Sequence, residues 1–224
     1  DSIFTRYNKF NHDFMLVDTA GLRKKSKVSE NIEFYSVMRA IRAIENSDIC
    51  LMMIDATRGL ESQDMNIISL ILKNNKGIIL LVNKWDLLEK DNKTARAVEK
   101  EIRSKTEPFT DYPILFISAT NKQRIHRILN EIDRVNNNRK RKIPTSEMNE
   151  VFLRIVNDYP PPATGGRHIR IKYVTQLPVY TPAFAFFCNY PSGIRNPYRR
   201  FIENRIREKY DFSGVPIRIY FRKK

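Results

Sequence analysis

Four short runs of consecutive apolar residues constrain the fold of this chain more than any other feature. They are Phe14–Val17 (FMLV), Ile49–Asp55 (ICLMMID), Gly77–Asn83 (GIILLVN) and Pro113–Ser118 (PILFIS). Continuous rather than alternating runs are typical of strands that helices cover on both faces. Between and after these runs, apolar residues recur at helical spacing over Ile32–Glu45, Asp64–Lys73, Thr94–Lys105 and Gln123–Asn137. This alternation predicts an α/β domain with a doubly wound parallel sheet.

A polar, charged stretch at Asn136–Lys142 (NNNRKRK), followed by Pro144, interrupts the pattern. We place a domain boundary there: a first domain over residues 1–138, a basic linker over 139–143 and a second domain over 144–224. The second domain is predicted to contain, in order, a helix, two strands, a helix and a strand, at Ser146–Asn157, His168–Thr175, Ala183–Asn189, Pro197–Tyr210 and Val215–Arg222. That order predicts a small α+β domain.

Charge is unevenly distributed over the 224 residues, whose formal net charge is +15. Residues 1–138 carry a net charge of +3 and residues 139–224 a net charge of +12. A neutral part joined to a strongly basic one predicts a polyanionic partner for the basic part. The alternative is a soluble domain that merely has a high isoelectric point.

Two classes of protein are excluded. No apolar run approaches the ~18 residues that cross a bilayer, so we expect no membrane partner. The two cysteines, Cys50 and Cys188, lie far apart in apolar segments, which indicates reduced thiols in a cytoplasmic protein rather than a disulfide scaffold or a metal cluster.

Three motifs follow predicted strands, where doubly wound sheets bind ligands. The first is Asp18-Thr19-Ala20-Gly21. Its Asp can hold Mg²⁺, usually through water, and its Gly lets a backbone N–H approach a terminal phosphate without an intervening Cβ. Alone, such a pair of residues is most often a plain turn.

The second and third motifs are Asn83-Lys84-Trp85-Asp86 and Ser118-Ala119-Thr120. The Asp86 carboxylate can accept two hydrogen bonds from the guanine edge, whereas adenine offers no such pair of donors. The Asn83 amide can bind the base, the Lys84 stem can lie on the purine face, and a small residue at 119 lets a backbone N–H reach a base oxygen. In this order the three motifs predict a guanine nucleotide pocket and disfavour an ATPase.

Longer segments carry a resemblance to a known family. They include Asp18–Asp48, Asp55–Asp64, the Asn83–Asp86 motif, Pro160–Pro162, Ile171–Gln176 and Arg199–Arg222. The chain resembles the translational-factor class of P-loop GTPases, and closely the tandem-GTPase ribosome-assembly factors of the Der (EngA) family. The resemblance spans essentially all 224 residues and matches the second GTPase domain and the C-terminal KH-like domain of that family.

The resemblance implies a role for each matching residue. Asp18 and Gly21 would lie by Mg²⁺ and the γ-phosphate, Asn83 and Asp86 would read guanine, and Ala119 would cap the base oxygen. The GTP-binding set is Asp18, Thr19, Ala20, Gly21, Leu22, Asn83, Lys84, Trp85, Asp86, Ser118, Ala119 and Thr120. Leu22 stands where Ras-like enzymes place a water-orienting Gln, which fits the family's assistance by a monovalent cation such as K⁺. The segment Arg23–Glu30 would be a nucleotide-sensing switch.

The phosphate-binding motif Gly-x-x-x-x-Gly-Lys-Ser/Thr does not occur in the sequence. In the related fold its strand lies in the middle of the sheet, between the FMLV and ICLMMID strands. Its loss would leave two strand edges unpaired inside a covered sheet. We therefore expect the sequence to begin inside a larger protein, and the 224 residues alone to be inactive as a GTPase.

Basic residues crowd the predicted helix near the C-terminus. They are Arg195, Arg199, Arg200, Arg205, Arg207 and Lys209, and they are candidates for a surface that follows RNA phosphates. The alternative is a solvated helix face. No Gly-x-x-Gly, the loop that clamps nucleotides in ordinary KH domains, occurs in the sequence. Structured ribosomal RNA or ribosomal proteins are therefore the expected partners.

Two hypotheses of function remain open. The first is a monomeric GTP-hydrolysing factor in assembly of the large ribosomal subunit, whose switch is coupled to the basic domain. The second is a non-enzymatic RNA- or ribosome-binding module with a vestigial or incomplete nucleotide site.

Overall fold

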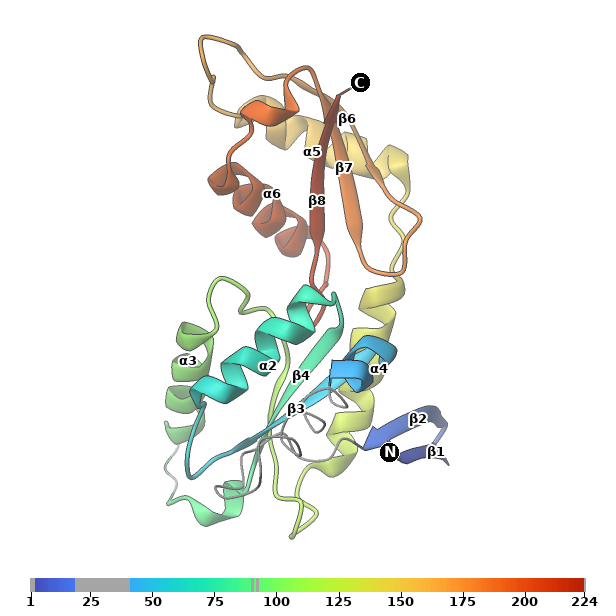
Figure 1. The fold of residues 1–224 in the computed structure, drawn as a ribbon, viewed down its shortest axis with the longest axis vertical. Helices are drawn as coiled ribbons and strands as arrows, with labels where there is room; N and C mark the ends of the chain where they lie inside the picture. The colour runs from blue at the N-terminus through green and yellow to red at the C-terminus, as the bar shows by residue number, and fades with distance from the viewer. Residues whose placement is uncertain (1–2, 19–40, 90, 92, 224) are drawn as a thin grey trace, which may run out of the picture. The chain divides into compact units, whose positions relative to one another are not determined.

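The computed structural model of the chain describes residues 3–18, 41–89, 91 and 93–223, with Ile3 and Asp18 described by their backbone alone. The residues form two compact units, Asp1–Asn136 and Asn137–Lys224. The elements of the first unit can be followed in Figure 1. They are β1 (Ile3–Lys9), β2 (His12–Asp18), β3 (Ile49–Asp55), α2 (Ser62–Lys73), β4 (Gly77–Asn83), the 3₁₀ helix η1 (Trp85–Leu87), α3 (Thr94–Lys105), β5 (Ile114–Phe116) and α4 (Ile125–Lys140).

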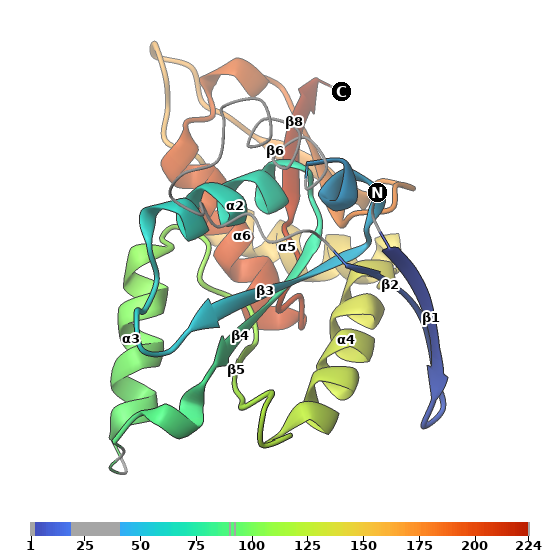
Figure 2. The ribbon, with the colours of Figure 1, turned by 60° about the horizontal axis from the view of Figure 1, so that its bottom comes forward.

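Strands β3, β4 and β5 form a parallel sheet with β4 in the centre. Ile78, Leu80 and Val82 of β4 pack into one core with Ile68 of α2 and Ile102 of α3. The alternate residues point to the opposite face, where a Cβ on Gly77 would stand 2.9 Å from Val135 of α4. Figure 2 shows the strands between α3 on one side and α4 on the other. Helices on both faces explain why β4 is an uninterrupted apolar run, as predicted.

The Phe14–Val17 run forms the predicted strand, and this strand does not pair with β3, in keeping with the related fold, in which another strand lies between the two. Strand β2 pairs antiparallel with β1 in a two-stranded ribbon, and Met15 and Leu16 are exposed. The hairpin turn is Phe10-Asn11, and both residues have positive φ, as the tightest hairpin turns require. Among the described strands β2 has no neighbour other than β1, so only the backbone groups on the edge that faces β1 pair with a strand.

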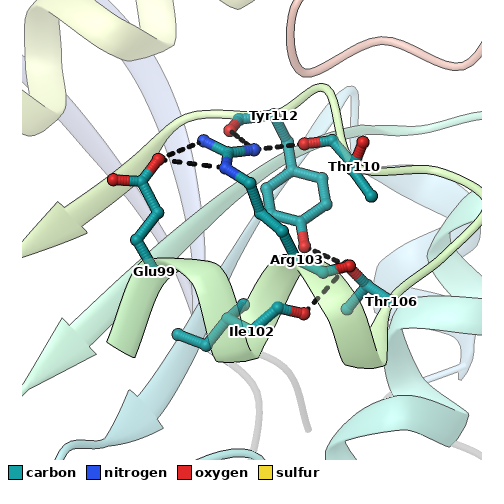
Figure 3. Close-up of polar contacts among 6 residues, drawn as sticks. All are labelled: Glu99, Ile102, Arg103, Thr106, Thr110 and Tyr112. Carbon is teal, nitrogen blue, oxygen red and sulfur yellow. Dashed lines mark hydrogen bonds and ion pairs between the residues drawn. The ribbon is translucent and has the colours of Figure 1, made fainter. Parts of the chain in front are cut away.

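A polar cluster at the end of α3 anchors the loop that leads to β5 (Figure 3). The Arg103 guanidinium donates to the Glu99 carboxylate at 2.7 Å and to the carbonyls of Thr110 and Tyr112. The Thr106 hydroxyl bonds the Tyr112 hydroxyl and the Ile102 carbonyl. Burial raises the pKa of Tyr112. This cluster fixes the residues immediately before β5, whose far end carries the third motif.

The second unit contains α5 (Thr145–Asp158), β6 (Ile171–Gln176), β7 (Ala183–Cys188), the 3₁₀ helix η2 (Pro191–Gly193), α6 (Asn196–Lys209) and β8 (Arg218–Lys223). The three strands form one sheet in the order β6-β7-β8, with β6 antiparallel and β8 parallel to β7. A core of aromatic and aliphatic side chains from the sheet, α5 and α6 holds the unit together. The predicted order of a helix, two strands, a helix and a strand is confirmed.

The polar break predicted at Asn136–Lys142 is largely helical, because α4 continues through Lys140. Asn138 is buried and its amide donates to Asp211 and to the Ser213 carbonyl, both at 3.1 Å. Further along, the Gln176 side chain accepts from Ile143 N–H at 2.9 Å and donates to the Arg141 carbonyl at 2.8 Å. Residues 141–143 are thus fastened to β6 of the second unit.

Candidate functional site

The second and third motifs meet at the carboxyl ends of β4 and β5. Asn83 is the last residue of β4, and its side-chain Oδ1 accepts a hydrogen bond from Ala119 N–H at 3.0 Å. Trp85 N–H donates to the Ile117 carbonyl at 3.0 Å. The sheet's register therefore brings together two motifs that lie about thirty-five residues apart, as the sequence predicts.

Lys84 joins the end of β4 to the end of β3. Its backbone is left-handed, with φ of 61° and ψ of 30°, which turns the chain sharply after the strand. Its Nζ donates to Asp55 Oδ2 at 2.7 Å, from a side chain that is 52% exposed to one that is 8% exposed. Lys84 and the Thr57 hydroxyl, both bonded to the Asp55 carboxylate, lower its pKa to about 2. The Lys84 stem is consequently held across the ends of two strands.

Trp85 and Asp86 have different environments within η1. The Trp85 ring is buried and lies 4.4 Å from the Phe116 ring, centroid to centroid. Trp85 thus packs in the core, where it fixes the position of the loop. The sequence predicts Trp85 as part of the GTP-binding set, and its position assigns it this supporting part. Asp86, the next residue, is half-buried.

The third motif forms a tight turn. Ser118 is fully buried, its backbone pairs with Gln123, and its Oγ accepts from Asn121 N–H at 3.1 Å. Ala119 and Thr120 are exposed at the tip. Because Ala119 N–H already donates to Asn83, a base oxygen would have to share or replace that bond.

The first motif lies at the edge of the described residues. The backbone of Asp18 ends β2, and Thr19, Ala20, Gly21 and Leu22 lie outside the described part, as does Arg23–Glu30.

Asp55 is a site residue that sequence reasoning missed. It ends β3 just as Asn83 ends β4, and that shared position at a strand end was the available signal. Its partner could not be inferred, because the Asp55–Lys84 pair spans 29 residues and depends on the left-handed turn at Lys84.

The six basic residues predicted near the C-terminus separate into two groups. Arg207 contacts Glu203 and the carbonyls of Phe212 and Val215, Arg199 donates to the Ile219 carbonyl at 3.0 Å, and Arg205 pairs with Glu208 at 2.6 Å. Arg199 and Arg207 thus tie α6 to the residues that follow it, whereas the Arg205–Glu208 pair lies within the helix. Arg195, Arg200 and Lys209 are exposed.

Family models match both units. The model of the elongation factor Tu GTP binding domain matches residues 3–138, and the model of the C-terminal KH-domain-like region of EngA bacterial GTPase enzymes matches residues 142–222. The chain therefore belongs to the family of the elongation factor Tu GTP binding domain. Its second unit is of the EngA KH-like type, which confirms the resemblance to the Der (EngA) family.

The chain is also similar in sequence to curated proteins of the Der family. GTPase Der of Bacteroides fragilis is 58% identical over 226 residues, and GTPase Der of Porphyromonas gingivalis is 54% identical over 225 residues. Each alignment covers 100% of this chain and 52% of the relative. The chain thus spans about half the length of the curated relatives it matches.

Solved structures support the predicted fold. The crystal structure of Era in complex with MgGDPNP and nucleotides 1506–1542 of 16S ribosomal RNA has a TM-score of 0.52 and 21% identity, covering 100% of this chain and 80% of that chain. At this identity the likeness shows the fold alone. The P-loop GTPase fold followed by a small KH-like domain is thereby confirmed.

Among the described residues, no helix is long and apolar enough to span a membrane.

Proposed function

We propose that the protein containing this chain binds GTP and GDP at the carboxyl ends of β3, β4 and β5 and hydrolyses GTP. The observation that carries the proposal is the hydrogen bond from Ala119 N–H to Asn83 Oδ1. It holds the two expected base-reading loops against each other, although they are distant in sequence. Membership of a GTP-binding domain family supports the same chemistry.

Each residue of the proposed pocket has a distinct task. Asp86 accepts the two donors of the guanine edge and thereby discriminates against adenine. Asn83 ties the Ala119 loop to β4 and presents its amide to the base. Lys84, held by Asp55, offers an extended stem on which the purine can lie.

Mg²⁺ would be held by Asp18 and the nucleotide phosphates. The described residues contain no group of three or more His, Cys, Asp or Glu side chains that could hold a metal. Mg²⁺ at phosphate sites is in general bound largely by phosphates and water, with few protein carboxylates. When bound, it neutralises charge on the β- and γ-phosphates. Leu22 has no group that orients water, so we propose that a monovalent cation such as K⁺ assists hydrolysis.

We further propose that the protein acts in assembly of the large ribosomal subunit as a monomer in the cytoplasm. The net charge of +12 on residues 139–224 supports a polyanionic partner for the second unit. The nucleotide state of the switch segment Arg23–Glu30 would change how strongly that unit binds the particle.

The second candidate is a non-enzymatic RNA- or ribosome-binding module. One observation favours it: the net charge of +12 on residues 139–224 supports a polyanionic partner without any nucleotide site. The two candidate functions differ in whether the intact protein binds guanine nucleotides at all.

Titration of the intact protein with fluorescent N-methylanthraniloyl GDP and ADP distinguishes the two. We expect GDP to bind at least about 100-fold more tightly than ADP, since a buried polar site rejects a base without matching donors. Asp86→Asn should shift preference towards xanthosine diphosphate, because Asn offers an N–H where xanthine offers a carbonyl.

Glu89→Gln is the matched control, since it removes an exposed carboxylate three residues further along. It should bind GDP like the wild type. A protein that binds neither nucleotide, or an Asp86→Asn variant with unchanged GDP preference, would contradict the proposed site.

A further inference from the structure

The face of the second unit's sheet that lies opposite its core carries aromatic and basic side chains. Val174, Phe184, Phe186 and Phe221 point into the core shared with α5 and α6. Because side chains alternate along a strand, the residues between them point the other way. Of these, the aromatic and basic residues are Tyr173, Phe187, Arg218, Tyr220 and Arg222, all exposed or half-buried, which together we call the open sheet face, while Ala183 and Ala185 between them are fully buried.

The register of the strands arranges this face in rows. Tyr173, Phe187 and Arg222 lie side by side on β6, β7 and β8, and the Tyr173 and Phe187 rings are 5.7 Å apart. Ala185 and Tyr220 lie opposite one another in the next row. Tyr173 is 40% exposed, while Phe187 and Tyr220 are half-buried. Three aromatic rings thus reach the surface of one flat sheet.

Cations adjoin these rings. The Arg222 guanidinium lies 5.7 Å from the centre of the Tyr220 ring, and Arg218 donates to the Tyr220 hydroxyl at 3.4 Å. Both arginines are exposed. Strands β6, β7 and β8 contain no Asp or Glu, so every charged side chain on them is positive. Aromatic rings interleaved with cations, without any carboxylate, complement a partner that offers flat bases and phosphates.

The aromatic rings of α6, in contrast, are not arranged for stacking. Tyr198 is buried in the core and its hydroxyl donates to the Tyr159 carbonyl. Phe201 is packed between Tyr159, Tyr198 and the Arg205 guanidinium. Helix α6 can therefore contribute charge through its exposed cations, but the rings that could stack on bases lie on the open sheet face.

We propose that the open sheet face binds single-stranded RNA, whose bases stack on Tyr173, Phe187 and Tyr220 and whose phosphates contact Arg218 and Arg222. The choice of RNA rests on the proposed function, and the surface itself rests on the sheet. Stacking is tolerant of sequence because every base has a π-face. The face therefore binds unpaired RNA without a strong sequence preference.

Fluorescence anisotropy of the intact protein with a labelled oligouridine about ten nucleotides long tests this surface. Tyr173→Leu, Phe187→Leu and Tyr220→Leu keep an apolar side chain but remove the ring, and each should weaken binding by about 5-fold or more. Phe187→Tyr and Tyr220→Phe retain a ring and should restore affinity. Arg222→Gln should lower the slope of log affinity against log salt by about one.

Tyr180→Leu is the matched control, since Tyr180 is 90% exposed on the loop between β6 and β7 and off this face. It should bind like the wild type, and urea unfolding checks that every variant folds. The proposal would be overturned if affinity were unchanged in the three ring variants but lost in Arg195→Gln, Arg200→Gln or Lys209→Gln. That result would place RNA binding on α6 and would still support RNA as the partner.

Absence of oligouridine binding by the wild type would overturn the proposed face, whereas pelleting with large ribosomal subunits tests the polyanionic partner and GDP binding tests the nucleotide site separately. Loss of a ribosomal protein contact in the ring variants, with RNA binding unchanged, would also overturn the proposal.

Discussion

Lys84 and Asp55 show how a single ion pair can organise the proposed nucleotide site. The carboxylate is buried and receives hydrogen bonds from Lys84 and from both the hydroxyl and the N–H of Thr57. Removing one partner from such a cluster leaves a buried polar group without compensation. The pair therefore contributes to stability as well as to the shape of the site.

Asp55→Asn is expected to lower the free energy of unfolding at pH 7 by about 1–2 kcal/mol, a value reduced for the solvent exposure of Lys84. The native pKa of about 2 lies below the ordinary value of 3.8. The carboxylate thus stabilises the fold above about pH 4, and this contribution is lost as pH falls from 4 to 2.

Urea unfolding of wild type and variant across that range measures the difference. The two free energies of unfolding should converge as pH approaches 2. A difference that stays constant between pH 7 and 2 would show that Asp55 does not act through its charge.

At the scale of elements, the central strand of the first unit shows how closely helix and sheet approach. Gly77 begins β4, and a Cβ there would stand 2.9 Å from Val135 and 3.0 Å from Ile49. Both neighbours are side chains in packed surroundings, and Val135 is fully buried. The absence of a side chain at 77 is what lets α4 lie against the sheet.

Gly77→Ala is expected to destabilise the first unit by about 1–3 kcal/mol, because overpacking forces neighbouring side chains out of their preferred positions. Val135→Ala removes the methyl groups that would collide with the new Cβ. The double variant should therefore lose less stability than the sum of the two single losses. Urea unfolding of all four proteins measures this coupling, and strict additivity would contradict the close contact.

The sequence predicted some of the strands and helices better than others. Apolar runs correctly predicted β3, β4 and β5. Burial on both faces explains the composition of β4, whereas Leu51 and Met53 of β3 are exposed. Helix α3 was predicted with its observed bounds, Thr94–Lys105. The extension of α4 through Lys140 was not predicted, because three asparagines in a row disfavour helix and the contacts of Asn138 with Asp211 and Ser213 are invisible in the sequence.

The site was predictable to a similar extent. Strand ends located Asn83 and Ala119 correctly relative to each other, because parallel strands bring their carboxyl ends to one edge. The bond that ties Ala119 N–H to Asn83 and the pairing of Lys84 with Asp55 depend on side-chain positions, which spacing alone does not determine. Similarly, nothing in the α6 sequence separates the structural Arg207 from the exposed Arg200.

At the scale of the whole molecule, the two units have separate cores with no residue in common. The nucleotide motifs lie in the unit of low net charge, and the cations gather in the other. A division of this kind is suited to a protein in which one part responds to a small ligand and the other holds a polyanion.

Pelleting of the intact protein with large ribosomal subunits tests whether the nucleotide bound by the first unit changes binding by the basic second unit. We expect binding to differ between GDP and a non-hydrolysable GTP analogue, and to weaken steeply as salt rises, because phosphate contacts release counterions. Asp86→Asn should abolish the difference between nucleotides without removing the salt dependence. Equal binding in both nucleotide states that is insensitive to salt would contradict the coupling.

The outer strands of the second unit's sheet each receive a side chain from a helix. Asn149 of α5 donates to the Val174 carbonyl and accepts from Val174 N–H on β6, and Arg199 of α6 donates to the Ile219 carbonyl on β8. Unprotected margins of a sheet recruit further chains and seed fibrils. At these positions the helix side chains take the place that a further strand would need, which leaves the broad surface of an aromatic-rich domain for other molecules.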